Sequence, residues 1–209
     1  MSRFLLEART ACVLMAAAYI VVPAAAAAAS TTESKAAQPS SAQDIASSEA
    51  PGLWVYPAVR GYGAVRPRPD LPSNLSSGTD YKVLVDVLHA NPDHAQVMSS
   101  LVRLARLVNL MAYAGIPRDH VHIAAVIEDM AGYAVLSNEA YRKQFNVDNP
   151  NLALLHELKS SGVELMVCAQ ALAENGWPDS DVSPDVTVTL SALTDFVVYG
   201  QRGYSFMQL

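Results

Sequence analysis

The strongest constraint on the fold is a repeated alternation of short apolar runs with helical segments. The first run, Tyr81–Leu88 (YKVLVDVL), is rich in Val and Leu, which is typical of a strand buried on both faces of a parallel sheet. Further runs follow at His120–Ile127, Val163–Cys168, Val186–Thr189 and Tyr204–Leu209. Helical segments separate these five runs, so the order predicts an α/β fold with a parallel, helix-covered sheet.

Capping and stop signals define the expected helices. Asn91-Pro92 and Asn149-Pro150 each combine an N-cap residue with a first-turn proline. The first pair predicts a helix to about Ala114, and the second predicts a helix to about Ser160. Three further helices are expected at Ser137–Phe145, Ala169–Asn175 and Ser191–Tyr199.

Residues 1–29 have the pattern of a secretory signal peptide. Arg3 and Arg9 precede an apolar run of 12 residues, Ala11–Val22, and alanines offer cleavage sites up to Ala29. Spanning a bilayer takes about 20 residues, so the run favours cleavage over a retained anchor. We therefore expect a periplasmic protein with no stable membrane anchor after cleavage.

Three regions follow the predicted signal peptide. Residues 30–50 are rich in Ser, Ala, Thr and Gln without apolar periodicity, which predicts a disordered linker. Residues 51–80 mix prolines with aromatic residues and predict an extended arm. This arm either lies along the domain or a neighbouring subunit, or forms a flap over a ligand site. Residues 81–209 then form a single α/β domain.

Charge and motif content exclude several classes of function. Removing residues 1–29 takes away two of the 14 basic and one of the 20 acidic residues and leaves a net charge of −7, which disfavours a nucleic-acid binder. No dinucleotide fingerprint, phosphate loop or zinc-ligand spacing is present. We therefore predict no cofactor and no metal.

Cys168 is the candidate catalytic residue. It is the only cysteine outside the predicted signal peptide, and it ends a predicted strand just before a helix. A helix N-terminus favours a thiolate, which can attack sulfur donors and carry a persulfide. Free cysteine is also among the most buried residue types, so a packing role is the alternative.

Polar residues follow two other predicted strands. Glu128 and Asp129 come directly after His120–Ile127, and Asn91 follows Tyr81–Leu88. Ligands of parallel α/β sheets bind outside the carboxyl ends of the strands, so these three residues are the candidate substrate-binding set. Glu128 and Asp129 are equally consistent with solvated loop residues or helix caps.

The segment Val163–Leu172 (VELMVCAQAL), followed by Gly176, resembles the cysteine segment of the DsrE/DsrF-like family. Supporting similarities lie at Asp148–Asn151 (DNPN), at Leu154–Leu158 (LLHEL) and at Gln201–Tyr204 (QRGY), and Pro57–Val65 is similar to the arm of exported members. The resemblance covers about residues 55–209. It implies a three-layer α/β sandwich with a five-stranded, mainly parallel sheet and helices on both faces.

The resemblance also implies homo-oligomers, often trimers or hexamers, and a sulfurtransferase-like role in which Cys168 passes persulfide sulfur between donor and acceptor proteins. The sequence departs from the family in two ways. Relay members usually work inside the cell, and many relatives have a His-Gly pair where Glu128-Asp129 stands here. The main alternative is a non-catalytic oligomeric binding or scaffold protein in which Cys168 only packs. A small-ligand binder that uses the arm is a third hypothesis.

Overall fold

The computed structural model describes residues 53–209, which contain a five-stranded sheet. The sheet order is β4-β3-β2-β1-β5, and all pairs of neighbouring strands are parallel. This confirms the predicted α/β sandwich. The strands are β1 (Tyr81–Val87), β2 (Val121–Ile127), β3 (Glu164–Cys168), β4 (Thr187–Thr189) and β5 (Ser205–Gln208).

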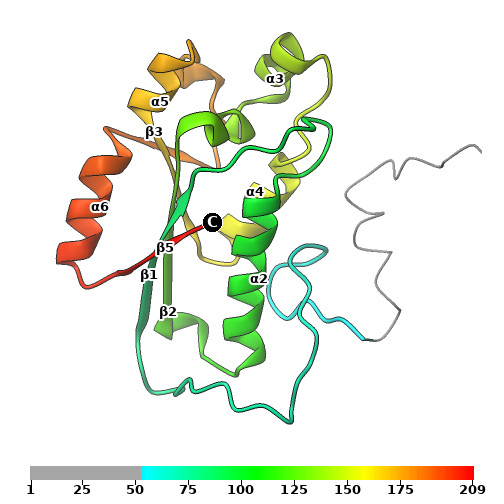
Figure 1. Cartoon of the computed structure of the whole chain (residues 1–209), viewed down its shortest axis with the longest axis vertical. Helices are drawn as coiled ribbons and strands as arrows, with labels where there is room; N and C mark the ends of the chain where they lie inside the picture. Colours follow the sequence, from blue (N-terminus) through cyan, green and yellow to red (C-terminus); the bar gives the residue numbers. More distant parts are fainter. Residues whose placement is uncertain (1–52) are drawn as a thin grey trace, which may run out of the picture. The chain divides into compact units, whose positions relative to one another are not determined.

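Helices connect successive strands and cover both faces of the sheet. Figure 1 shows α6 on one side of the strands and α2 and α4 on the other. The helices are α2 (Ser99–Tyr113), α3 (Asn138–Phe145), α4 (Leu152–Ser160), α5 (Ala169–Glu174) and α6 (Ala192–Gln201). Three 3₁₀ segments lie at Arg118–His120, Asp129–Val135 and Asp179–Asp181.

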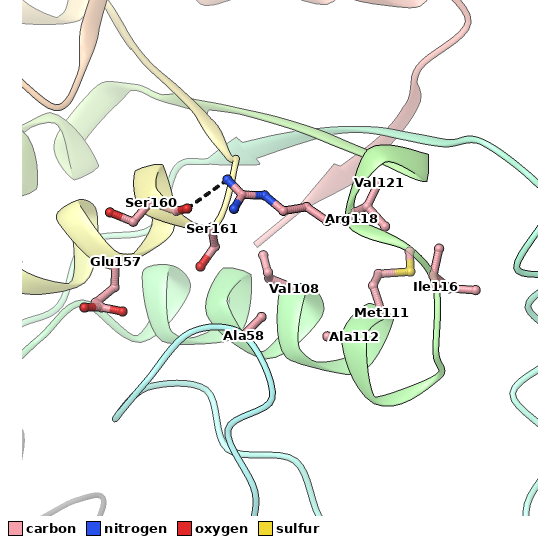
Figure 2. A pocket seen from close by; sticks show the side chains of 10 residues that line it. All are labelled: Ala58, Val108, Met111, Ala112, Ile116, Arg118, Val121, Glu157, Ser160 and Ser161. Atoms are coloured by element: carbon pink, nitrogen blue, oxygen red, sulfur yellow. Dashed lines mark hydrogen bonds between the residues drawn. The ribbon is translucent and has the colours of Figure 1, made fainter.

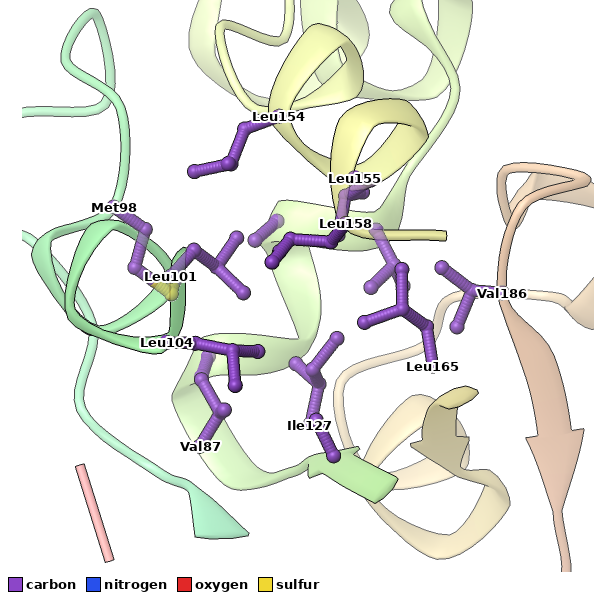
Figure 3. Packing of buried hydrophobic residues seen from close by; sticks show 14 of the residues in the cluster. Val87, Met98, Leu101, Leu104, Ile127, Leu154, Leu155, Leu158, Leu165 and Val186 are labelled. Carbon is purple, nitrogen blue, oxygen red and sulfur yellow. The ribbon is translucent and has the colours of Figure 1, made fainter. Parts of the chain in front are cut away.

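Alternation along the strands divides the core into two clusters. In β1, Val83 and Val85 face the α2 and α4 side, whereas Leu84 faces α6. The larger cluster, on the α2 and α4 side, is filled by aliphatic side chains such as Leu101, Leu158 and Ile127 (Figure 3). Because both faces of the central strands are buried, the strands have the continuous apolar character from which they were predicted.

The two asparagine-proline pairs do not begin helices, which corrects the sequence prediction. Helix α2 begins at Ser99 and α4 at Leu152. Asn91 accepts a hydrogen bond from the backbone N–H of Ser99, eight residues later, at 3.1 Å. Asn149 donates its amide to the carbonyls of Ala134 and Leu136. The Asn91 side chain therefore stabilises the loop before α2. The Asn149 side chain stabilises the turn before α4, because its oxygen also accepts from the N–H of Asn151.

Residues 53–80 contain no regular helix or strand and pack through their first part against α2. Buried Asn109 of α2 accepts hydrogen bonds from the N–H groups of Ala58 and Val59, each at 2.8 Å. Its amide donates to the carbonyls of Tyr62 and Gly63. One asparagine side chain thus anchors this loop on the outer side of α2.

The predicted signal peptide, the linker and the first two residues of the arm lie outside the described residues. Within residues 53–209, no helix is long and apolar enough to cross a membrane.

Candidate functional site

Cys168 is the last residue of β3 and the N-cap residue of α5. Its thiol is free and the residue is only 4% exposed. It faces the α6 side of the sheet in the smaller core cluster, together with Met166, Ala192 and Tyr199. Helix α5 has only six residues, so the surroundings of the thiol are defined more by the neighbouring strand ends than by a helix dipole.

The register of the sheet places Glu128 beside Cys168. Ile127 of β2 pairs with Val167 of β3, and Glu128 continues the extended backbone of β2 with φ −140° and ψ 179°. Glu128 is therefore the next residue in register with Cys168, on the same face. Neighbouring strands lie about 4.8 Å apart, so the carboxyl and the thiol belong to one small region at the carboxyl edge of the sheet.

A buried carboxylate of β1 shares this edge. Asp86 is in register with Val126 and therefore lies on the same face as Glu128 and Cys168, since Val126 belongs to the α6-side cluster. Asp86 is 2% exposed. Its Oδ2 accepts a hydrogen bond from Gln208 of β5 at 2.8 Å. Its Oδ1 is buried without an N–H or O–H donor from the described part of the chain.

Burial raises the pKa of Glu128 to about 7, and the negative charge of Asp86 and a hydrogen bond between the two carboxyl groups add to the effect. The charge of Asp129 acts in the same direction with a smaller effect. A carboxylate only accepts hydrogen bonds, so a bond between two carboxyl groups requires a proton on one of them.

The other neighbour of Cys168 is β4. Thr189 pairs in register with Cys168 and donates its hydroxyl to Asp195 of α6 at 2.6 Å. Polar groups therefore stand at this edge on both sides of the cysteine. Within residues 53–209, no three side chains of the types His, Cys, Asp and Glu are arranged to hold a metal ion.

The predicted substrate-binding residues occupy different positions. Glu128 lies beside Cys168, whereas Asp129 is exposed and adopts a left-handed backbone with φ 47°. The side chain of Asn91 is used by its own loop, because its amide donates to the carbonyl of Val97 and its oxygen accepts from Ser99. Of the three residues, Glu128 alone shares the face of the thiol.

The sequence interpretation missed Asp86 and Gln208. A signal was available for Asp86, because it is the one acidic residue inside the apolar run Tyr81–Leu88 and acidic residues are rarely fully buried unless paired. Gln208 gave no comparable signal. Its contact depends on the pairing of β5 with β1, between residues 122 positions apart.

A separate pocket of about 320 Å³ lies at the opposite end of the sheet. Figure 2 shows its apolar floor, formed by side chains such as Met111 and Ile116, and a polar rim that includes Arg118 and Glu157. Arg118 donates to the carbonyl of Ser160 at 2.8 Å. Because the pocket adjoins the start of β2, it does not reach the carboxyl end of β3, where Cys168 lies.

The fold and this edge define a class of protein: a parallel α/β domain with a single thiol at the carboxyl end of a strand. The model of the DsrE/DsrF-like family matches residues 82–209, so the chain belongs to the DsrE/DsrF-like family. The matched segment contains Cys168 and all five strands, apart from Tyr81, the first residue of β1.

Among solved structures, the chain is similar to a protein of unknown function from Methanobacterium thermoautotrophicum. The two share 21% sequence identity with a TM-score of 0.46, over 62% of this chain and 100% of the other. No curated protein matches the chain.

Proposed function

We propose that this DsrE/DsrF-like protein carries sulfur as a persulfide on Cys168. The observation that carries the proposal is the position of the free thiol at the carboxyl end of β3, in register with Glu128. Ligands of parallel α/β folds bind at this edge. Membership of a family that often serves in sulfur relay supports the same assignment.

The proposed chemistry needs a donor persulfide and no external oxidant. The Cys168 thiolate attacks the terminal sulfur of a donor R–S–SH. A sulfur–sulfur bond forms on Cys168 while the donor bond breaks, and the donor leaves as R–SH with the proton that Cys168 gave up. The reverse sequence passes the sulfur to an acceptor thiol. This is an exchange reaction of the kind that thiolates undergo with disulfides.

Incubation of the purified full chain with a small-molecule persulfide donor tests the proposal. We expect a mass increase of about 32 Da, one sulfur atom, on the peptide that contains Cys168, and loss of the increase after reduction. Cys168→Ala is expected to gain nothing on that peptide. An unmodified Cys168 under conditions that modify a free cysteine in solution would exclude the carrier function.

The scaffold alternative is favoured by one observation, the 4% exposure of Cys168. Reactive cysteines are usually partly exposed, whereas buried structural cysteines are inert. In that case Cys168 packs against Met166 and Ala192 and makes no covalent bond to sulfur. The mass measurement separates the two functions, because only the carrier function produces an adduct on Cys168.

We further propose that the protein is exported to the periplasm. The support is the pattern of residues 1–29, in which a short apolar run follows Arg3 and Arg9. The mass of the protein recovered from cells is expected to correspond to a chain that begins at Ser30. A chain recovered from the cytoplasm with Met1 in place would contradict this.

A homo-oligomer is the expected assembly. The support is the outer face of α6, defined here as Leu193 and Val197 of the helix together with Leu190 just before it, which are 72%, 60% and 71% exposed. The outer face of a surface helix is normally polar. Contiguous exposed aliphatic side chains typically mark an interaction site, and a second copy of this chain is the proposed occupant.

A further inference from the structure

We infer that Asp86 and Glu128 form a proton-accepting pair that takes the proton from the Cys168 thiol when the thiolate forms. This inference rests on the proposed function of Cys168 and names the group that receives its proton. Three strands contribute: β1 provides Asp86, the end of β2 provides Glu128, and β3 provides the thiol.

The first support is the unsatisfied oxygen of Asp86. Asp86 is 98% buried, and a buried oxygen without a donor destabilises the folded state. Gln208 satisfies only Oδ2. Glu128 lies on the same face of the sheet, two residues beyond the register partner of Asp86 on the neighbouring strand, so a proton held by its carboxyl can provide the missing donor.

The second support is the position of Glu128 between its two neighbours. Asp86 lies on the adjacent strand on one side, and Cys168 lies on the adjacent strand on the other. All three side chains are on the α6 side of the sheet. Because the carboxyl of Glu128 rotates on two methylene groups, it can hydrogen bond to Asp86 when protonated and face the thiol when ionised.

In the inferred step, one proton moves from the sulfur of Cys168 to the carboxylate of Glu128. With the pair ionised, the S–H bond of Cys168 breaks and an O–H bond forms on Glu128. The new O–H donates to Asp86, which stabilises the proton at the receiving position. A general base is most effective when its pKa lies near the working pH, and the pKa of Glu128 is raised to about 7 by burial and by Asp86.

Other titratable side chains come from the elements that pack around Glu128 and Cys168. Asp129 follows Glu128 in the 3₁₀ segment, and its negative charge raises the pKa of Glu128.

Two further titratable groups, Asp195 and Tyr199, come from α6. Asp195 accepts a hydrogen bond from Thr189, and Tyr199 contacts the sulfur of Met166. His89, after β1, lies against the carbonyl of Leu209. Asp86 and Asp129 are the carboxyl groups whose negative charges raise the pKa of Glu128.

The test is the pH dependence of alkylation of Cys168 by iodoacetamide, followed by mass spectrometry of its peptide in the full chain. Glu128→Gln keeps the size and offers an amide donor to Asp86, but it cannot accept the proton. We expect the wild-type rate to rise through an inflection near pH 7. The variant should lack this inflection and react at least about tenfold more slowly near neutral pH.

At strongly alkaline pH, hydroxide takes the proton in both proteins, and the two should react at rates within about twofold of each other. Asp129→Asn is the matched control, because it removes a neighbouring exposed carboxylate and should retain the inflection. A Glu128→Gln variant that reacts as fast as wild type or faster near pH 7 overturns the inference. So does uniform slowing at every pH, which indicates a packing defect, and so does a thiol that is not alkylated at any pH.

This experiment uses no sulfur donor, so its outcome is independent of the persulfide measurement. A chain with the inflection but without a sulfur adduct keeps the proton-accepting pair and loses the carrier function. A chain with the adduct but without the inflection keeps the carrier function and loses the pair.

Discussion

At the residue scale, Gly61 and Gly63 show how differently two neighbouring glycines constrain the chain. Both have positive φ, 76° and 62°. A Cβ on Gly61 would meet nothing within 4 Å, whereas a Cβ on Gly63 would lie 2.2 Å from the backbone nitrogen of Arg106 and 2.5 Å from the carbonyl carbon of Ala105. Gly63 therefore permits the close approach of the loop to α2, and Gly61 only permits a turn.

We predict that Gly63→Ala destabilises the protein far more than Gly61→Ala. Gly61→Ala carries only the cost of a left-handed backbone, about 1–2 kcal/mol. Gly63→Ala adds a backbone clash, which should lower the free energy of unfolding by about a further 3 kcal/mol. Urea unfolding followed by the fluorescence of Trp54 and Trp177 measures both effects. Equal losses in the two variants would show that the loop does not rest closely on α2.

The strand-end positions of Cys168 and Glu128 could be predicted from the sequence, because each stands at the end of an apolar run. The rule that sites form at the carboxyl ends of parallel strands then brings them together. The partnership of Glu128 with Asp86 could not be predicted in the same way. It depends on the order of the strands and on which face each side chain occupies, and neither property is local.

At the element scale, the strands were predicted within one residue of their observed ends. For β1, β2 and β3 the reason is that a strand buried on both faces has a continuous apolar pattern. The starts of α2 and α4 were predicted too early. For α4, the Asn149 oxygen accepts locally from the N–H of Asn151, in the turn before the helix. For α2, the reason is that an asparagine can cap at a distance. Asn151 accepts a hydrogen bond from the N–H of Met98, 53 residues away, and Asn91 accepts one from Ser99. The sequence shows the capping residue but not the helix that it caps.

Ser137 is the contrasting case. It was predicted to begin a helix, and its hydroxyl accepts a hydrogen bond from the N–H of Ala140 at the start of α3. Ser191 does the same for Leu193 at the start of α6. At these two serines the cap and the capped group lie within three residues, and the local sequence was sufficient to define the helix start.

At the scale of the whole molecule, the two sides of the sheet differ in how they meet solvent. On one side, α2 is covered in part by residues 58–63, which Asn109 anchors. On the other side, the inner positions of α6, such as Ala192 and Tyr199, pack on the sheet, while the outer face of α6 is left uncovered by the described part of the chain. This asymmetry favours association through α6.

We predict that the protein forms a homo-oligomer whose interface includes the outer face of α6. Leu193→Asp is expected to shift the mass measured by light scattering during size-exclusion chromatography toward that of one chain, because a buried unpaired carboxylate is strongly unfavourable. Leu71→Asp is the matched control, since Leu71 is 55% exposed but lies in the segment 53–80, away from α6. A wild-type protein that elutes with the mass of one chain would contradict the prediction. So would equal dissociation by Leu71→Asp, because the outer face of α6 would then have no special part in assembly.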